Sequence, residues 1–204
     1  MVGKPRLIWE YRWQEAHLFD VYSDTDWAGC PRTRKSTSGG CVMIGNHLIK
    51  AWSSTQPGIS LSSGEAEVVG VTRASAVALG FTSLLRDFGH KTMKGRVWTD
   101  SSAAIGICKR QGLGKLRQLD TQMLWVQQRV RNNDLDLYYV PGEANPADVF
   151  TKPNIPHARM DSLLEAMGCV FDEGRAESAP TLRTEGGTKT FSITREGPGW
   201  SHPR

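Results

Sequence analysis

The longest regular feature of the sequence is a helical segment that begins after Ser62 and ends before Gly89. Ser62 can cap the helix, and Glu65 three residues later completes a capping box that satisfies free backbone N–H groups. Gly89 is typical of a helix C-terminus, where the chain takes a left-handed conformation. A helix of this length must bury one face, so the rest of the chain has to supply a packing layer for it.

Strand-like segments lie on both sides of this helix. Residues 17–24 alternate in polarity, and the segments GCVMIGN and HLIKAWSS meet at Gly45-Asn46, which predicts a β-hairpin. Short strands and helices then alternate along the chain at residues 96–100, 101–110, 119–131 and 134–140. A last helix begins in NPADVFTKP and is limited by Pro153. The order βββαβααβα predicts the α/β fold class, with a hairpin at one edge of the sheet.

The two ends of the chain differ in character from its middle. Residues 1–15 mix aromatic and basic side chains without periodicity, and we expect them to be the remnant of a preceding connection region. Residues 16–168 are expected to form the folded domain. Residues 169–204 contain few apolar side chains to offset the entropy of ordering, so we expect a disordered tail there.

Composition narrows the classes of protein that fit. No stretch of about 18 apolar residues appears, so we expect no membrane span, and the N-terminus lacks the apolar run of a secretory signal. The cysteines form no C-x-x-C pair, which argues against a zinc module and favours a reduced intracellular chain, in the cytoplasm or nucleus. A net charge of +4 permits an acidic partner such as nucleic acid.

Four acidic side chains stand at the ends or starts of the predicted elements: Asp24, Glu67, Asp100 and Asp148. Acids at the carboxyl ends of adjacent strands project into one crevice, where like charges repel strongly. Magnesium relieves this repulsion, because it binds carboxylate oxygens and retains waters for chemistry. The pattern is consistent with a site for two ions that would promote phosphoryl displacement, but each acid taken alone is more readily explained by turn or helix-start chemistry.

Two glutamates compete for the position on the long helix. Glu65 and Glu67 point about 200° apart, so only one of them can face the other acids. The helical face that continues from Glu67 is apolar and should lie on the sheet, whereas Glu65 has a role in the capping box. We therefore assign the site glutamate to Glu67.

Four longer stretches narrow the interpretation further. They are YSDTDWAGCPRTRKSTSGG, WSSTQPGISLSSGEAEVVG, VWTDSSAAI and YYVPGEANPADVFTKP. From about Val21 to Pro153, and in this order, they resemble successive blocks of the ribonuclease H domain in copia-type (LTR) retrotransposon Pol polyproteins. The resemblance implies a ribonuclease H-like fold, a five-stranded mixed sheet flanked by helices.

The resemblance also implies a chemistry. Carried over block by block, the four acids (Asp24, Glu67, Asp100 and Asp148) fall on the family's catalytic, metal-binding positions. It implies two Mg²⁺ ions, with Mn²⁺ as the alternative, and a metal-dependent endonuclease that hydrolyses the RNA strand of RNA–DNA hybrids during reverse transcription. The implied partners are the hybrid and a reverse transcriptase domain of the same polyprotein. No membrane partner is expected, and the oligomeric state is left open.

Basic and small polar residues near the acids are the candidates for holding the hybrid. Basic side chains contact phosphates, and hydrogen bonds to 2′-hydroxyls identify the RNA strand. The candidates are Arg32, Arg34, Lys35, Ser36, Ser101, Lys109 and Lys115. The chain departs from the family at Gln118, where histidine is usual. The loop VPGEANPAD also lacks the histidine of cellular ribonucleases H, which predicts slow turnover.

Two other interpretations stay open from the sequence. The first is a catalytically inactive retrotransposon remnant that acts as a nucleic-acid-binding or interaction module, motivated by the missing polymerase and the unrelated tail. A DNA-strand transferase of the same superfamily is the third interpretation. It is disfavoured by the hairpin block, by the glutamate on the first long helix and by an aspartate as the last acid.

Overall fold

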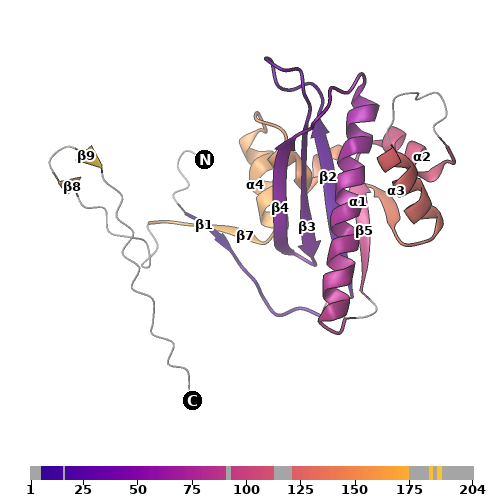
Figure 1. Ribbon diagram of the computed structural model, residues 1–204. Coiled ribbons are helices and arrows are strands. Elements are labelled where there is room, and N and C mark those ends of the chain that lie inside the picture. The colour runs from indigo at the N-terminus through magenta and orange to yellow at the C-terminus, as the bar shows by residue number, and fades with distance from the viewer. Residues whose placement is uncertain are drawn as a thin grey trace. The chain divides into compact units, whose positions relative to one another are not determined.

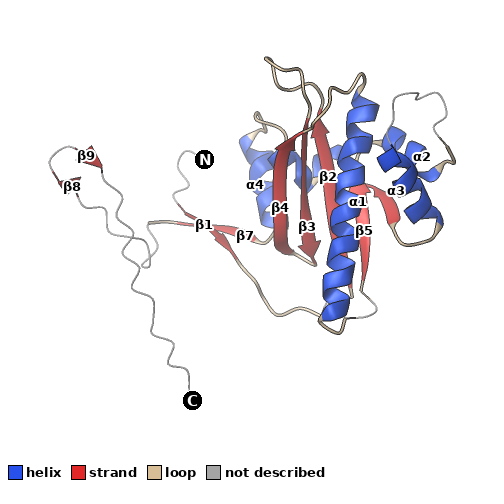
Figure 2. Cartoon of the chain, in the orientation of Figure 1, coloured by secondary structure: helices blue, strands red, loops and turns tan. Residues whose placement is uncertain are grey.

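The computed structural model describes residues 6–15, 17–90, 93–112, 121–174, 184–185 and 188–189. The chain divides into two compact units, Ile8–Val170 and Met1–Leu7 with Phe171–Arg204. The larger unit contains the sheet and helices drawn in Figures 1 and 2. In the smaller unit, β8 (Thr184–Glu185) and β9 (Thr188–Lys189) pair antiparallel.

A five-stranded mixed sheet forms the centre of the larger unit. In spatial order its strands are β4 (His47–Thr55), β3 (Thr37–Ile44), β2 (Leu18–Asp26), β5 (Lys94–Thr99) and β6 (Asp136–Tyr139). β4, β3 and β2 are antiparallel neighbours, and β5 and β6 continue the sheet in parallel with β2. The predicted mixed sheet and its edge hairpin are confirmed, and Gly45 takes a positive φ of 56° in the hairpin turn.

Helices cover both faces of the sheet. α1 (Ser63–Asp87) crosses one face, with α2 (Ser102–Lys109) and α3 (Thr121–Arg131) beside it (Figure 1). On the other face lie the 3₁₀ helices η1 (Gly142–Ala144) and η2 (Pro146–Phe150) and the helix α4 (His157–Ala166). This arrangement confirms the ribonuclease H-like, α/β class of the fold.

α1 forms where the sequence predicted it. Ser62 Oγ accepts a hydrogen bond from the Glu65 N–H at 3.2 Å, and the Glu65 carboxylate accepts one from the Leu61 N–H at 2.6 Å. The buried face of the helix, including Val68 and Val71, packs into the core with strand residues such as Phe19 and Val97. The core of the larger unit therefore lies between α1 and the sheet.

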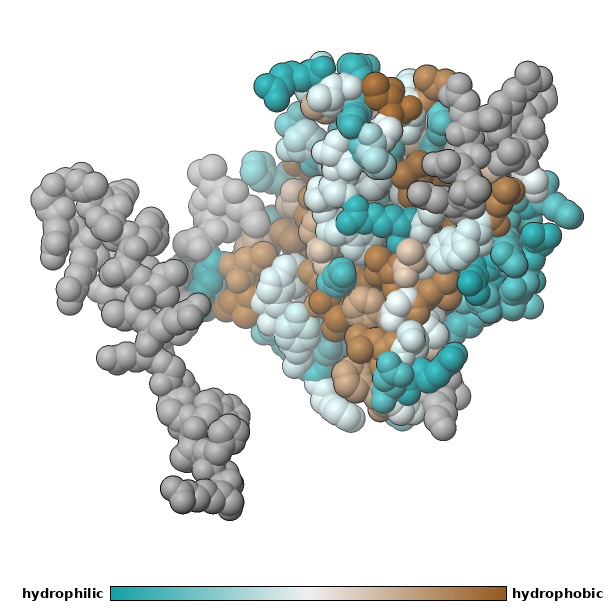
Figure 3. Space-filling view, in the orientation of Figure 1, coloured by the Kyte–Doolittle hydropathy of each residue, from teal (hydrophilic) through white to brown (hydrophobic). Residues whose placement is uncertain are grey.

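α1 departs from the expectation that the chain has no long apolar segment. By length and composition alone, α1 is apolar enough to cross a membrane, a test that the core helix of a globular domain also passes. Its apolar character is explained by the face that it buries in the core. Seen from the α1 side, the hydrophobic surface is broken into patches among hydrophilic ones (Figure 3).

Three boundaries differ from the sequence prediction. β2 continues to Asp26 because its pairing with β3 continues, so Asp24 lies inside a strand opposite Gly39 and not at its end. Asp148 lies within the short helix η2 and does not open the last helix, α4, which begins only after Pro156. The predicted disordered tail was to start at residue 169, but β7 (Cys169–Asp172) is a strand that pairs with β1 (Arg6–Trp9).

Candidate active site

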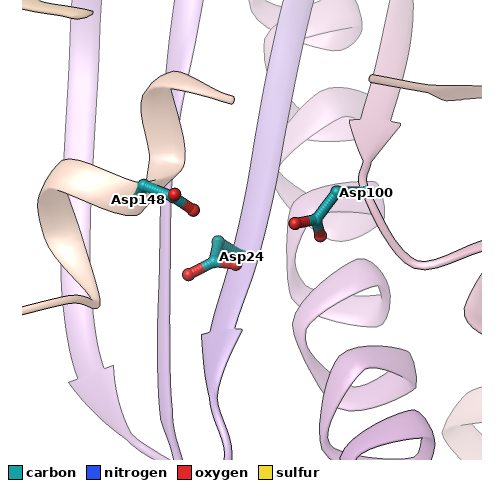
Figure 4. A group of neighbouring side chains, drawn as sticks. All are labelled: Asp24, Asp100 and Asp148. Carbon is teal, nitrogen blue, oxygen red and sulfur yellow. The ribbon is translucent and has the colours of Figure 1, made fainter. Parts of the chain in front are cut away.

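Three aspartates from separate parts of the sequence meet at one place. Each of Asp24, Asp100 and Asp148 offers a carboxylate oxygen, and these oxygens all lie within 4.8 Å of one another. Figure 4 shows the three side chains turned toward one another from β2, from the end of β5 and from η2. Asp148 is fully buried, Asp24 is 2 % exposed, and Asp100 is half-buried. The cluster therefore has two deeply buried members and one more accessible member.

The sheet places two of these aspartates side by side. β2 and β5 are parallel neighbours, with Ser23 of β2 opposite Thr99 of β5. The next residue in each case is an aspartate, so Asp24 and Asp100 stand next to one another. Adjacent parallel strands thus bring these two acids together, as the sequence predicted.

The third aspartate is brought in by η2. Asn145 caps η2, and its Nδ2 donates to the Ser23 carbonyl at 3.0 Å, which ties η2 to β2. A Cβ on Gly39 would lie 2.6 Å from Thr151 Cγ2, so only glycine allows this part of the chain to lie so close to β3. Thr151 Oγ1 also donates to Asp24 Oδ2. Asp148 therefore stands beside Asp24 because of close, specific packing after β6.

The cluster holds more negative charge than its surroundings favour. Burial raises the pKa of Asp24 to about 6, with the charges of Asp148 and Asp100 adding to the increase and the Thr151 hydrogen bond opposing it. The pKa of Asp100 is raised as well, chiefly by burial and then by the charge of Asp148. Lys152 lowers the pKa of both carboxyl groups, but its charge does not offset the effect of burial and of the neighbouring acids.

Glu67 lies next to this cluster but is not one of the three closest groups. Burial raises its pKa to about 8, and the charges of Asp24 and Asp100 raise it further, while a hydrogen bond from the Thr25 backbone opposes the shift. Its Oε2 is buried without a hydrogen-bond partner among the residues that the structure describes. The structure thus places Glu67 near the aspartates, whereas Glu65 is engaged at the start of α1.

Two cations at the cluster were missed in the sequence. Lys152 Nζ lies 2.7 Å from Asp148 Oδ1 and 3.7 Å from Asp24 Oδ1. Arg159, from α4, donates through Nη2 to Asp148 Oδ2 and, at 2.6 Å, to the Gly142 carbonyl. Lys152 stands four residues after Asp148, a spacing that brings side chains together in helical turns and could have identified it. Arg159 has no such signal, because it reaches the site from the next helix.

The predicted nucleic-acid-binding residues are only partly placed to meet a ligand. Arg32 and Arg34 are exposed, and Lys35 is half-buried, in the loop between β2 and β3. Ser36 is fully buried and its Oγ accepts from the Ala28 N–H at 3.1 Å, so its prediction as a ligand contact is wrong. Burial makes this hydroxyl part of the loop's internal structure.

The remaining candidates lie beyond β5. Ser101 follows Asp100, and its Oγ accepts from the Ala104 N–H at 3.1 Å, which caps α2. Lys109 is exposed in the last turn of α2. Lys115 lies outside the described residues, as does Gln118. Binding of nucleic acid by Arg32, Arg34, Lys35, Ser101, Lys109 and Lys115 stays a prediction.

The donor set of the cluster fits a hard divalent cation. Each of the grouped ligands is a carboxylate, and oxygen ligands are those that magnesium and manganese favour. The unpartnered Oε2 of Glu67 is a buried acceptor that an ion or its bound water would satisfy. Burial, and then repulsion between the acids, raises the pKa values of Asp24 and Glu67, and a divalent charge would oppose both effects.

Known proteins resemble this chain over most of the larger unit. The retrovirus-related Pol polyprotein from transposon TNT 1-94 of Nicotiana tabacum is 26% identical over 148 residues, which are 72% of this chain and 11% of that protein. The Pol polyprotein from transposon RE1 of Arabidopsis thaliana is 30% identical over 135 residues, 65% of this chain and 9% of that protein. The chain thus spans about a tenth of the length of these relatives.

The chain was also compared with protein-family models and with solved structures. No protein-family model matches the chain. Among solved structures, LC11-RNase H1, isolated from compost by a metagenomic approach, aligns with a TM-score of 0.46 and 18% identity, over 72% of this chain and 99% of that one. The chain is thus similar in sequence to one segment of the retrovirus-related Pol polyproteins of transposons, and its own fold, a five-stranded mixed sheet flanked by helices, is ribonuclease H-like.

Proposed function

We propose that this chain is a metal-dependent endonuclease that hydrolyses the RNA strand of RNA–DNA hybrids. The observation that carries the proposal is the convergence of Asp24, Asp100 and Asp148 within 4.8 Å in a partly buried site. The sequence similarity of the chain to transposon Pol polyproteins supports a role in reverse transcription, next to a reverse transcriptase domain. The substrate class rests on the sequence blocks that resemble a ribonuclease H domain.

Each acid has a distinct task under this proposal. Asp24 and Asp148 are buried and fixed by hydrogen bonds, so they would anchor the cation, and the more exposed Asp100 would face the incoming phosphate. Glu67 would complete the set from α1 with its unpartnered Oε2. When bound, Mg²⁺ or Mn²⁺ would supply activation of water and stabilisation of the leaving oxygen in an in-line displacement, for which two ions are proposed.

Recognition of the substrate would come from the surface around these acids. The exposed Arg32 and Arg34 in the loop after β2 are free to contact phosphates, and the half-buried Ser101 follows Asp100 directly. Contacts to 2′-hydroxyls in the wide minor groove would separate a hybrid from duplex DNA. These contacts would select the substrate, while the acids carry out the cleavage.

The direct test is to incubate the purified chain with an end-labelled RNA–DNA hybrid, duplex DNA and single-stranded RNA, each with Mg²⁺ and with EDTA. We expect cleavage of the RNA strand of the hybrid, with Mg²⁺ only. Cleavage of duplex DNA would instead favour a strand transferase. A folded chain that binds the hybrid and cuts nothing, with Mg²⁺ or with Mn²⁺, would favour an inactive remnant.

A further inference from the structure

Lys152 stands among the acids where a cation is expected. Its Nζ is 2.7 Å from Asp148 Oδ1 and 3.7 Å from Asp24 Oδ1, so one ammonium group lies between two carboxylates of the cluster. The lysine side chain is 40% exposed, whereas those of Asp24 and Asp148 are 3% and 0% exposed. Lys152 therefore lies between these buried oxygens and the solvent.

The local chain fixes Lys152 in this place. Its backbone N–H donates to the Asp148 carbonyl at 2.9 Å, so the two residues belong to one turn of chain at the end of η2. The side chain is thereby directed to the carboxylate of the residue four positions earlier. This position follows from the same short segment that carries Asp148 into the site.

The second cation at the cluster is held differently. Arg159 Nη2 bonds both Asp148 Oδ2 and the Gly142 carbonyl, and the guanidinium belongs to α4. These two bonds join η1, η2 and α4, which makes Arg159 a fixed part of the structure around the site. Lys152 has a flexible stem and an ammonium group that meets the carboxylates as a point charge, so it can leave them at lower cost.

Lys152 and a divalent ion would compete for the same carboxylates. Lys152 contacts Oδ1 of Asp24 and Oδ1 of Asp148. The Oδ2 atoms of the two carboxylates accept hydrogen bonds from Thr151 and Arg159, so the Oδ1 atoms are the ones left for a divalent ion. An ammonium group and a divalent ion cannot share these oxygens without strong repulsion at a separation of a few ångströms. The ion can bind there only if Lys152 moves toward solvent.

We propose that Lys152 is a built-in counter-cation of the metal site, which neutralises Asp24 and Asp148 in the metal-free protein and is displaced when a divalent ion binds. Lys152 thereby weakens metal binding in the absence of substrate and stabilises the empty site. This inference rests on the proposed metal-dependent function of the same acids. It assigns Lys152 a role in setting metal affinity, distinct from that of the ligands.

The test measures metal binding by the full chain without nucleic acid. Mn²⁺ is titrated into wild type, Lys152→Gln, Lys152→Arg and Lys94→Gln, and free Mn²⁺ is followed by electron paramagnetic resonance. Lys94 is the matched control because it pairs with Asp136 on β6 and does not contact the cluster. We expect Lys152→Gln to bind Mn²⁺ about tenfold more tightly or better, the order expected when one like charge is removed at about 4 Å. Lys152→Arg and Lys94→Gln should stay within about twofold of wild type.

A second readout follows Lys152 in the wild-type protein and needs a variant only to assign its signal. In wild-type protein with ¹³C-methylated lysines, the Lys152 signal, assigned by its absence from Lys152→Arg, should move toward that of exposed lysines when Mg²⁺ is added. The Lys94 signal should not change. A Lys152 signal that keeps its metal-free position at saturating Mg²⁺ contradicts the displacement.

The outcomes separate this inference from the proposed function. If wild type binds Mn²⁺ and Asp100→Asn does not, but Lys152→Gln binds no more tightly than wild type, the metal site stands and the role of Lys152 is wrong. If Lys152→Gln binds Mn²⁺ where wild type does not, the counter-cation role is supported. If neither binds Mn²⁺, both the metal site and the role of Lys152 are wrong.

Discussion

Gly70 of α1 lies so close to Thr25 of β2 that a Cβ at residue 70 would be 2.6 Å from Thr25 Oγ1. The same Cβ would be 3.1 Å from Ser23 Oγ, so glycine sets the distance between α1 and the strand that carries Asp24. Glu67 lies one turn earlier on α1. The close approach at Gly70 therefore also places Glu67 near the aspartates.

Gly70→Ala should destabilise the protein by about 1–3 kcal/mol, because the methyl group forces α1 away from β2. Gly80 offers a matched control on the same helix, since a Cβ there meets nothing within 4 Å. Gly80→Ala should stabilise the protein by up to about 1 kcal/mol through helix propensity alone. Urea unfolding of both variants checks the pair. Equal effects would show that the contact between Gly70 and Thr25 does not limit the position of α1.

The sheet face that carries Asp24 also holds a structural ion pair. Asp20 accepts hydrogen bonds from Arg96 Nε and Nη2 at 2.7 and 2.8 Å and from Trp98 Nε1 at 2.6 Å. Asp20→Ala leaves these donors without their acceptor and should cost about 2 kcal/mol of unfolding free energy. Thermal unfolding measures this cost, and hybrid cleavage should persist below the melting temperature. A loss of cleavage by folded Asp20→Ala would mean that this pair belongs to the site.

Asp136→Ala is the control for that substitution. Asp136 pairs with Lys94 at 2.8 Å, but both side chains are more than a third exposed, so solvent screens the interaction. Its loss should cost about 0–1 kcal/mol. An equal loss of unfolding free energy in Asp136→Ala and Asp20→Ala would show that burial does not separate the two ion pairs.

Metal binding should depend on pH because the acids of the site hold protons. The pKa of Glu67 is raised to about 8 and that of Asp24 to about 6, and a carboxylate must be ionised to ligate a cation. Affinity for Mg²⁺ should therefore rise between about pH 6 and pH 8.5, with release of protons. Calorimetry in buffers of different ionisation enthalpy measures that release. Glu67→Gln should reduce the release, and an affinity independent of pH would contradict the shifts.

The stability of the metal-free protein should fall as pH rises, over the range in which the affinity for Mg²⁺ increases. A carboxyl group whose pKa is raised in the folded state contributes stability below its unfolded pKa, and this contribution is lost as pH rises through the folded pKa. For Glu67 the loss extends from about pH 4.5 to about pH 8. The melting temperature in EDTA should thus fall over this range by more in wild type than in Glu67→Gln. The same fall in both proteins would assign it to other groups.

Much of the fold could be predicted because local signals agreed with one another. The capping residues Ser62 and Glu65, the turn at Gly45 and the stop at Gly89 each depend on neighbouring residues, and the structure has all of them. Strand β2 was predicted too short. The pairing that carries it to Asp26 is made with β3, a partner distant in sequence.

Elements that depend on distant contacts could not be predicted in the same way. β1 and β7 are short, and each has its partner at the other end of the chain. α4 was not predicted, although it supplies Arg159 to the site. Ser36 was assigned to the surface because its neighbours are basic, and only the folded loop shows that its hydroxyl is buried.

The sequence predicted the acidic residues of the candidate site but not its two cationic residues, Lys152 and Arg159. The four acids stand near predicted element ends, where side chains from neighbouring strands and helices meet. The choice of Glu67 over Glu65 followed from helix geometry, because the apolar face that lies on the sheet continues from Glu67. Lys152 lies within the sequence block YYVPGEANPADVFTKP, but its contacts depend on the turn at the end of η2.

The central claim is that the clustered aspartates cut the RNA strand through a bound metal. The most direct measurement is the rate of cleavage of a labelled RNA–DNA hybrid at saturating Mg²⁺ by wild type, Asp100→Asn and Asp136→Asn, with hybrid affinity measured in parallel. Asp100→Asn should lower the rate by about a thousandfold or more, about 4 kcal/mol in activation free energy, while hybrid affinity and folding persist and Asp136→Asn keeps the wild-type rate. Cleavage by Asp100→Asn at the wild-type rate would contradict the claim.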